Sequence, residues 1–401
     1  MATSPLPTHS PLPPFIAIPD WQGWTSVHPT KESPQTPAYL KTDVGLAAAA
    51  DVFPTPLPDA GYKYQCALAL VNQEGQVWVN FMSLKSTFTD GEQQVPVPDW
   101  LFPSWIRVLR EDVFKTKLAL SAVAIGSELY LYAVSEAGTP YDANQVYYTS
   151  TSDGQSYSRW EKVSGGAKTT NLAVCAAPDG MLYLVDSGGS VWMNSNPTNN
   201  PTDPPGVWSQ IAPSDPFRTD AGVCACVGNS QSFPYVGNSP TACTLVCKAL
   251  GQENDIQYLS PNAQAWQPLP PQPAPGQSIA SSAATASAPI AAEGEENPGC
   301  SLLFLTGPNR DIYVSAPFFP DAGKVAGKAD SMYRPSSQLG WDNSDLVGFR
   351  SDAPLAAAVT RPVQMQQPVG PTQLLVLFAK GLDYGDVKMN YAWISYQPDV
   401  P

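Results

Sequence analysis

The sequence predicts an all-β protein: a six-bladed β-propeller built from four-stranded antiparallel blades. Three observations support this fold class. A four-part pattern of short apolar runs recurs six times along the 401 residues, no helical periodicity separates the runs, and 43 Pro with 29 Gly are typical of a fold rich in turns. Because closed repeat folds of this length form one unit, we expect residues 1–401 to be a single domain, with a Pro-rich, extended segment at 1–14.

The first strand of each unit is expected to be short and lined with small residues. Inner strands of a propeller converge on a central axis, where large side chains would collide, so Ala, Ser, Cys and Gly are favoured there. The predicted inner strands are 46–52, 118–125, 172–177, 222–227, 279–287 and 355–359.

The second strands carry larger aliphatic residues, and each is followed by a turn with Gly or Asn, as hairpin connections require. They are predicted at 67–71, 129–134, 182–185, 245–249, 302–306 and 374–379. Alternating third strands then begin at Val77, Val146, Val191, Ile256, Ile312 and Val387.

A Trp with an aliphatic residue three positions later marks the fourth strands. This pattern starts at Trp105, Trp160, Trp208, Trp266 and, more loosely, Trp341. The chain ends soon after the third strand of the sixth unit, whereas Trp24-Thr25-Ser26-Val27 near the N-terminus fits the same pattern. We therefore expect residues 21–27 to supply the closing strand of the last blade, which would join the chain ends and remove an exposed sheet edge.

Charge excludes one class of partner. The formal net charge is −14 and the 21 Lys and Arg are scattered, whereas a nucleic-acid surface needs clustered cations. We expect neutral ligands and no nucleic acid. No charged-then-apolar leader and no apolar run long enough to span a bilayer are found, which predicts a cytoplasmic protein without membrane insertion.

The chain has seven Cys, and the odd number argues against a complete disulfide framework. Cys224, Cys226, Cys243 and Cys247 are the one dense group. Their positions on neighbouring predicted strands favour buried thiols over a zinc site, so we expect no metal and no cofactor.

A second recurrence lies just before the inner strands, where a cation, a hydroxyl residue and usually an acid follow one another. The copies are Lys41-Thr42-Asp43, Lys115-Thr116-Lys117, Lys168-Thr169-Thr170, Arg218-Thr219-Asp220 and Arg350-Ser351-Asp352. Cations beside carboxylates supply paired donors and acceptors for sugar hydroxyls or an acetamido group. The alternative interpretation is structural: the Thr or Ser caps a turn, and the charged residues form local pairs.

Aromatic residues at the start of the third strands could add apolar contact with a pyranose ring. Candidates are Trp78, Tyr147, Trp192 and Tyr313. Packing between blades is the alternative role for these rings, and it is the commoner use of aromatics in propellers.

Catalysis finds little support in the sequence. His9 and His28 are the only histidines, so no Ser-His-Asp or Cys-His arrangement is well founded. Residues 151–157, Thr-Ser-Asp-Gly-Gln-Ser-Tyr, resemble the Asp-box hairpin of sialidases with one glycine missing. That box is a structural turn in its family, and a sialidase would also need an arginine cluster and a Tyr with a Glu partner. We therefore predict a protein that is not an enzyme.

Together, the six Ala-lined units, the recurrent cation-hydroxyl-acid motif and the acidic, Trp-rich chain resemble the mushroom β-propeller lectins, the N-acetylglucosamine-specific Agrocybe type in particular. The resemblance implies a multivalent fungal lectin that binds terminal non-reducing N-acetylglucosamine of glycans and glycoproteins in repeated pockets on one face, including external glycans after release. It places the binding residues at the motif positions. Lys41, Lys115, Lys168, Arg218 and Arg350 would donate hydrogen bonds, and Asp43, Asp220 and Asp352 would accept them, beside Thr219, Ser351, Trp78, Trp192 and Tyr313.

Two other functions are open on this sequence. A propeller face can bind another protein as a scaffold, and a sialidase-like glycosidase is the less favoured alternative. Competition by simple sugars would separate the lectin from the scaffold.

Overall fold

The computed structural model describes residues 15–16, 22–27, 40–50, 66–86, 96–102, 104–166, 169, 175–176, 180–201, 204–227, 243–251, 255–259, 263–269, 303–306, 310–315, 349–359, 372–382 and 385–397. In this part of the chain every regular element is a β-strand, and the strands form antiparallel sheets in sequence order. Within it there is no helix long and apolar enough to cross a membrane.

The first blade is larger than predicted. Its strands are β3 (Ala47–Ala50), β4 (Cys66–Val71), β5 (Val77–Ser86), β6 (Pro96–Trp100) and β7 (Ile106–Arg107). The predicted fourth strand is β7, which pairs with the start of β5, while β6 pairs with the extended end of β5. Strand β6 was not expected from the sequence.

The next three blades have the four-stranded antiparallel arrangement that the repeat predicts. The second consists of β8 (Ser121–Ile125), β9 (Glu128–Val134), β10 (Val146–Thr151) and β11 (Glu161–Lys162). The third consists of β12 (Cys175–Ala176), β13 (Leu182–Val185), β14 (Val191–Asn194) and β15 (Trp208–Gln210). The fourth consists of β16 (Cys224–Val227), β17 (Cys243–Lys248), β18 (Ile256–Leu259) and β19 (Gln267–Pro268).

The fifth unit contributes one described hairpin, β20 (Leu303–Thr306) with β21 (Ile312–Ser315). The last blade consists of β22 (Ala356–Val359), β23 (Thr372–Lys380) and β24 (Val387–Gln397), joined by the N-terminal strands β1 (Phe15–Ile16) and β2 (Thr25–Ser26). The predicted inner strand at 279–287 and the segments at 1–14 and Trp341 lie outside the described residues.

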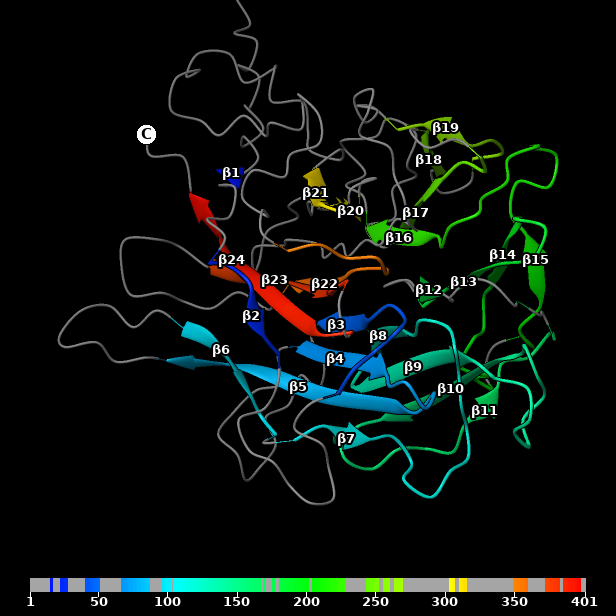
Figure 1. Cartoon of the computed structure of the whole chain (residues 1–401). Helices are drawn as coiled ribbons and strands as arrows, with labels where there is room; N and C mark the ends of the chain where they lie inside the picture. The colour runs from blue at the N-terminus through cyan, green and yellow to red at the C-terminus, as the bar shows by residue number, and fades with distance from the viewer. Residues whose placement is uncertain are drawn as a thin grey trace, which may run out of the picture.

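The sheets lie around a common centre, with the first strand innermost in each blade whose first strand is described (Figure 1). Neighbouring inner strands contact one another in the series β22, β3, β8, β12 and β16. Small residues make this convergence sterically feasible: β3 is Ala47–Ala50 and β22 is Ala356–Val359. The arrangement is that of a β-propeller.

Large side chains fill the spaces between blades, where they remove apolar surface from water. Between the last and first blades, Leu68, Trp105 and Phe378 are completely or almost completely buried in one hydrophobic cluster. A second cluster between the first and second blades contains Phe81 and Leu129. Packing between blades therefore accounts for much of the aromatic content.

The N-terminal strand joins the last blade, as the sequence predicted. Thr25 pairs with Met389 and Ser26 with Lys388 in an antiparallel register, and Val27 is fully buried in the cluster between the last and first blades. Strand β1 extends the same sheet beyond the prediction. A closed ring of six blades stays a prediction, because the described part of the fifth unit is a single hairpin.

Candidate functional site

The Thr or Ser of the recurrent motif is buried at a turn. In four copies its side-chain oxygen accepts the N–H of the residue two positions later at 3.0–3.4 Å and donates to that residue's carbonyl at 3.1–3.4 Å. The four residues are Thr42, Thr116, Thr219 and Ser351. This is the structural role considered above, and it leaves the hydroxyls of Thr219 and Ser351 unavailable to a sugar, contrary to their predicted binding role.

These four residues and Thr169 of a fifth copy link neighbouring blades through their backbone. Each donates its N–H to the carbonyl of a residue in the turn between the second and third strands of the preceding blade, an interaction we call the junction hydrogen bond. The pairs are Thr42 with Gly385 (3.1 Å), Thr116 with Gly75 (3.0 Å), Thr169 with Asn144 (3.1 Å), Thr219 with Gly189 (3.0 Å) and Ser351 with Arg310 (2.9 Å). All five acceptors have φ between 63° and 82°, which explains why Gly prevails there.

The residue before the motif's cation packs against the fourth-strand Trp of its own blade. Phe114 stacks on Trp160 with centroids 4.1 Å apart, and Phe217 stacks on Trp266 at 4.4 Å. In the last blade Phe349 lies 4.7 Å from Trp24, which the N-terminal segment supplies. The recurrence of Phe before Lys or Arg at positions 114, 217 and 349 is the sequence signal of this packing, which was not among the predicted features.

Most charged members of the motif are engaged within the protein. Asp220 pairs with Lys248 at 3.1 Å, and Arg350 pairs with Asp311 at 3.1 Å. Arg218 donates to the Phe217 carbonyl at 2.6 Å.

Asp352 is held by two cations. It pairs with Lys380 at 2.5 Å and with Arg310 at 3.1 Å. Lys41 is half-buried, and Lys168 lies outside the described residues. The predicted cations and acids are therefore brought into local ion pairs more often than into open pockets.

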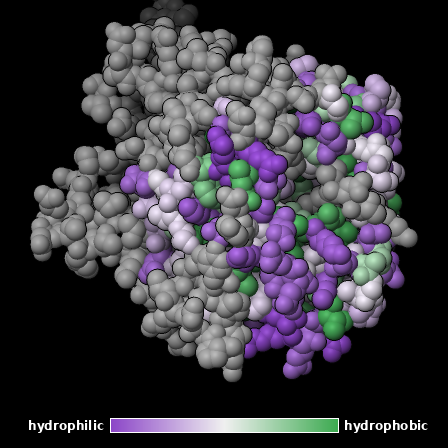
Figure 2. Space-filling model, viewed as in Figure 1, coloured by the Kyte–Doolittle hydropathy of each residue, from purple (hydrophilic) through white to green (hydrophobic). Residues whose placement is uncertain are grey.

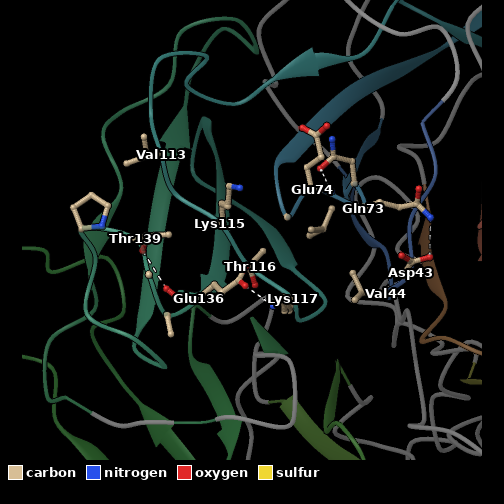
Figure 3. A pocket seen from close by; sticks show the side chains of 16 residues that line it. Asp43, Val44, Gln73, Glu74, Val113, Lys115, Thr116, Lys117, Glu136 and Thr139 are labelled. Atoms are coloured by element: carbon tan, nitrogen blue, oxygen red, sulfur yellow. Dashed lines mark hydrogen bonds and ion pairs between the residues drawn. The ribbon is translucent and has the colours of Figure 1, made fainter.

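The junction between the first two blades opens into a groove of about 850 Å³ (Figure 3). Four segments line it: the loop that leads into β3, the β4–β5 turn, the loop that leads into β8, and the β9–β10 turn. The residues 72–75, 113, 115–117 and 136–140 come from these segments, and Asp43 and Val44 complete the lining with Val71. Figure 2 shows hydrophilic side chains gathered over the first two blades on the face in view.

The groove combines donors, acceptors and apolar surface. Lys115 is exposed and has no ion-pair partner in the described part of the chain, and Asp43 accepts a hydrogen bond from Gln73 at 3.3 Å. Lys117 and Glu136 form a 2.5 Å ion pair on one side. Val113, with 55% of its surface exposed, adds an apolar contact. The predicted Lys115 and Asp43 thus line the same groove, although they belong to two copies of the motif.

The predicted aromatic residues lie elsewhere. Trp78 is only 6% exposed within the cluster between the last and first blades, so neither ring face can receive a sugar. Trp192 donates its Nε1–H to Asp186 at 2.8 Å, and Tyr147 is buried. Tyr313 packs beside the fourth-blade cluster, and burial, with the nearby Asp311 carboxylate, raises its pKa. The packing role fits these positions, and the groove has no aromatic lining residue.

A tyrosine and a glutamate do pair, but far from the inner strands. Tyr148 donates to Glu161 at 2.8 Å on the outer strands β10 and β11. Burial raises the pKa of Tyr148 above its usual range, and the Glu161 carboxylate raises it further. A higher pKa opposes the nucleophilic phenolate that this type of glycosidase needs.

The incomplete Asp-box forms a tight turn in the second blade. Asp153 accepts the backbone N–H groups of Gln155 at 2.8 Å and Ser156 at 2.7 Å. Burial alone would raise the pKa of Asp153, but these hydrogen bonds outweigh it, so the pKa lies below its ordinary value. The carboxylate is thus used by the turn.

The described cysteines form no disulfide with one another. Cys224, Cys243 and Cys247 are buried, and burial raises the pKa of Cys247. Among the described residues no group of His, Cys, Asp and Glu could hold a metal ion. The Cys226 side chain lies outside the description.

No protein-family model matches the chain, and no curated protein matches it. Among solved structures it is similar to a Dyadobacter fermentans protein of unknown function (9% identity, TM-score 0.43, covering 94% of this chain and 100% of that chain). It is also similar to the Trypanosoma rangeli sialidase (10% identity, TM-score 0.42, covering 93% of this chain and 59% of that chain). A third similar structure is the parainfluenza virus 5 hemagglutinin-neuraminidase ectodomain (7% identity, TM-score 0.46, covering 96% of this chain and 85% of that chain). Likenesses this weak carry no argument about function, and the resemblance to the mushroom lectins stays a prediction.

Proposed function

We propose that this protein is a non-enzymatic carbohydrate-binding protein and that the groove between the first two blades is its sugar site. The observation that carries the proposal is the exposed ammonium of Lys115, which has no ion pair among the described residues, in a groove that also offers carboxylates and apolar surface. An unengaged cation costs no internal interaction when a ligand binds. A sugar needs this mixture, because its hydroxyls both donate and accept hydrogen bonds while its ring carbons are apolar.

The finer proposal is that the groove accepts glycans ending in N-acetylglucosamine. Lys115 would donate to a ring hydroxyl or to the acetamide carbonyl, Asp43 would accept from a hydroxyl, and Val113 would contact the acetamide methyl. These roles use one donor and one apolar surface from the loop that leads into β8 and one acceptor from the loop that leads into β3. Glycans and glycoproteins with such ends are the proposed partners.

The copies of the motif do not offer the same unpaired charged side chains to a ligand at every junction. Asp220, Arg350 and Asp352 are engaged in ion pairs, so binding there would have to compete with them. We therefore assign the groove as the principal site, and avidity then depends on how many chains a glycan surface gathers.

The test is a glycan array of the purified protein, repeated with free N-acetylglucosamine as competitor and with Lys115→Met. We expect competed binding, and an affinity roughly 10- to 150-fold weaker for the variant, since a hydrogen bond to a charged group contributes about 1.5–3 kcal/mol. Lys162→Met is the matched control, because Lys162 is a lysine on β11 that does not line the groove. A blank array from folded protein would contradict the proposal and favour the scaffold. Equal loss in both lysine variants would contradict the groove as the site.

A further inference from the structure

The groove carries an excess of negative charge. Three carboxylates and two ammonium groups line it, a formal balance of −1, contributed by Asp43, Glu74, Glu136, Lys115 and Lys117. The 2.5 Å pair between Lys117 and Glu136 neutralises one group of each sign. Two carboxylates, of Asp43 and Glu74, then face a ligand together with the single ammonium of Lys115. The whole chain is also acidic, with a formal net charge of −14.

Glu74 is held in the groove by its backbone, while its exposed carboxylate has no ion-pair partner among the described residues. The Asn72 side chain accepts the N–H of Glu74 at 3.1 Å and that of Gln76 at 2.8 Å, which fixes the turn. Lys115 and Glu74 extend from different loops in Figure 3. The carboxylate therefore belongs to the groove surface, and a bound sugar would lie within its field.

The third blade shows that this turn does not need a side chain at the position of Glu74. There the Asp186 side chain accepts the N–H of Gly188 at 2.8 Å and that of Ser190 at 2.9 Å, the same pattern as Asn72 with residues 74 and 76. Gly188 occupies the position of Glu74. Because the same turn forms without a side chain there, the charge of Glu74 acts on what enters the groove and not on the fold.

We infer that the groove selects uncharged sugars and that Glu74 and Asp43 exclude acidic ones, such as sulfated sugars. This inference rests on the proposed function, since it concerns which sugars the same groove accepts. The repulsion between a ligand anion and two nearby carboxylates exceeds its attraction to one ammonium, and the field of the acidic chain opposes anion entry as well.

The experiment compares N-acetylglucosamine with N-acetylglucosamine 6-sulfate by isothermal titration calorimetry at low and high salt. The two ligands share the ring and the acetamido group and differ by one anionic group. We expect the neutral sugar to bind roughly 3- to 10-fold more tightly in dilute buffer, and the ratio to shrink in about 1 M salt, where the screening length is about 3 Å. Steric exclusion of the sulfate would not respond to salt, so an unchanged ratio would overturn the inference.

Glu74→Gln and Glu111→Gln form the matched pair of variants. Both remove one negative charge from exposed side chains, but Glu111 does not line the groove. Glu74→Gln is expected to reduce the preference for the neutral sugar several-fold, and Asp43→Asn in addition is expected to abolish it, while Glu111→Gln leaves it unchanged. Equal effects of both glutamate variants, or a wild-type preference for the sulfated sugar, would overturn the inference. Failure of the wild-type protein to bind either sugar would instead overturn the proposed function.

Discussion

The junction between the first two blades and the junction that precedes the last blade share a backbone link but differ in their side chains. In the first, Thr116 donates to the carbonyl of Gly75 at 3.0 Å; in the second, Ser351 donates to the carbonyl of Arg310 at 2.9 Å. Both acceptors have φ in the left-handed region, at 82° and 65°. The backbone geometry is thus the same, although one acceptor is Gly and the other is Arg.

The motif cations beside these two hydrogen bonds are exposed at one junction and ion-paired at the other. At the first junction Lys115 remains exposed beside the groove. At the second, Arg350 pairs with Asp311, and Asp352 pairs with both Arg310 and Lys380. The repeat therefore encodes the hydrogen bond that links the blades, while the charged side chains beside it line an open groove at one junction and form ion pairs at the other. A recurrent motif is therefore not in itself a recurrent binding site.

Breaking the shared backbone link should have the largest effect. Gly189 has φ of 80°, and a Cβ there would lie 2.7 Å from the carbonyl oxygen of Thr219, so Gly189→Ala must displace the junction hydrogen bond. Gly138→Ala is the control, because Gly138 has φ of 88° but nothing within 4 Å of the added Cβ. We expect a loss of unfolding free energy of about 3 kcal/mol for Gly189→Ala and about 1 kcal/mol for the control, measured by urea denaturation. Equal losses would show that the steric contact with Thr219 does not matter.

Asp43, which lines the groove, and Asp352, the equivalent acid in the last copy of the motif, should differ in their contribution to stability. Asp352 is the partner of Lys380, whose side chain is only 8% exposed, whereas Asp43 accepts one exposed hydrogen bond from Gln73. Removing the charge in Asp352→Asn leaves a buried ammonium without its partner and is expected to cost about 2 kcal/mol. Asp43→Asn is expected to change stability by less than about 0.5 kcal/mol. Thermal and urea unfolding of both variants would test the difference, and similar losses would contradict the distinction between open and paired junctions.

The strand pattern of this fold was predictable because period and turn chemistry are local. Hairpins such as β9 and β10 follow the predicted runs, and the N-terminal strand was found because the Trp24–Val27 pattern matches the other fourth strands. Strand β6 was missed for a physical reason. Its sequence, Pro-Val-Pro-Asp-Trp, contains two Pro, which cannot donate to a ladder and are tolerated at such a position mainly on sheet edges.

The candidate site was predictable only in part. Lys115 and Asp43 were identified because they recur, whereas Glu74 and Val113 occur at one junction and left no repeating signal. Recurrence was also a poor guide to sugar-binding residues, because the residues that recur between blades are those that hold the blades together. A Trp recurs at the second position of two third strands, as Trp78 and Trp192, yet Trp78 fills the space between blades. Thr219 likewise recurs but caps a turn. Sequence cannot separate these roles, because burial depends on contacts between segments far apart in the chain.

The smallest expected effect comes from making the second junction resemble the first at its acceptor. Arg310→Gly removes a side chain from a residue with φ of 65° and relieves a left-handed strain of about 1 kcal/mol, but it also removes the 3.1 Å pair with Asp352. That pair is half-exposed, with a contribution of about 0–1 kcal/mol, and Gly adds chain entropy to the unfolded state of about 0.5–1 kcal/mol. The terms oppose one another, so we expect a net change within about 1 kcal/mol of zero by urea denaturation. A larger loss would mean that the Arg310–Asp352 pair, and not the junction hydrogen bond, holds the last blade to the fifth unit.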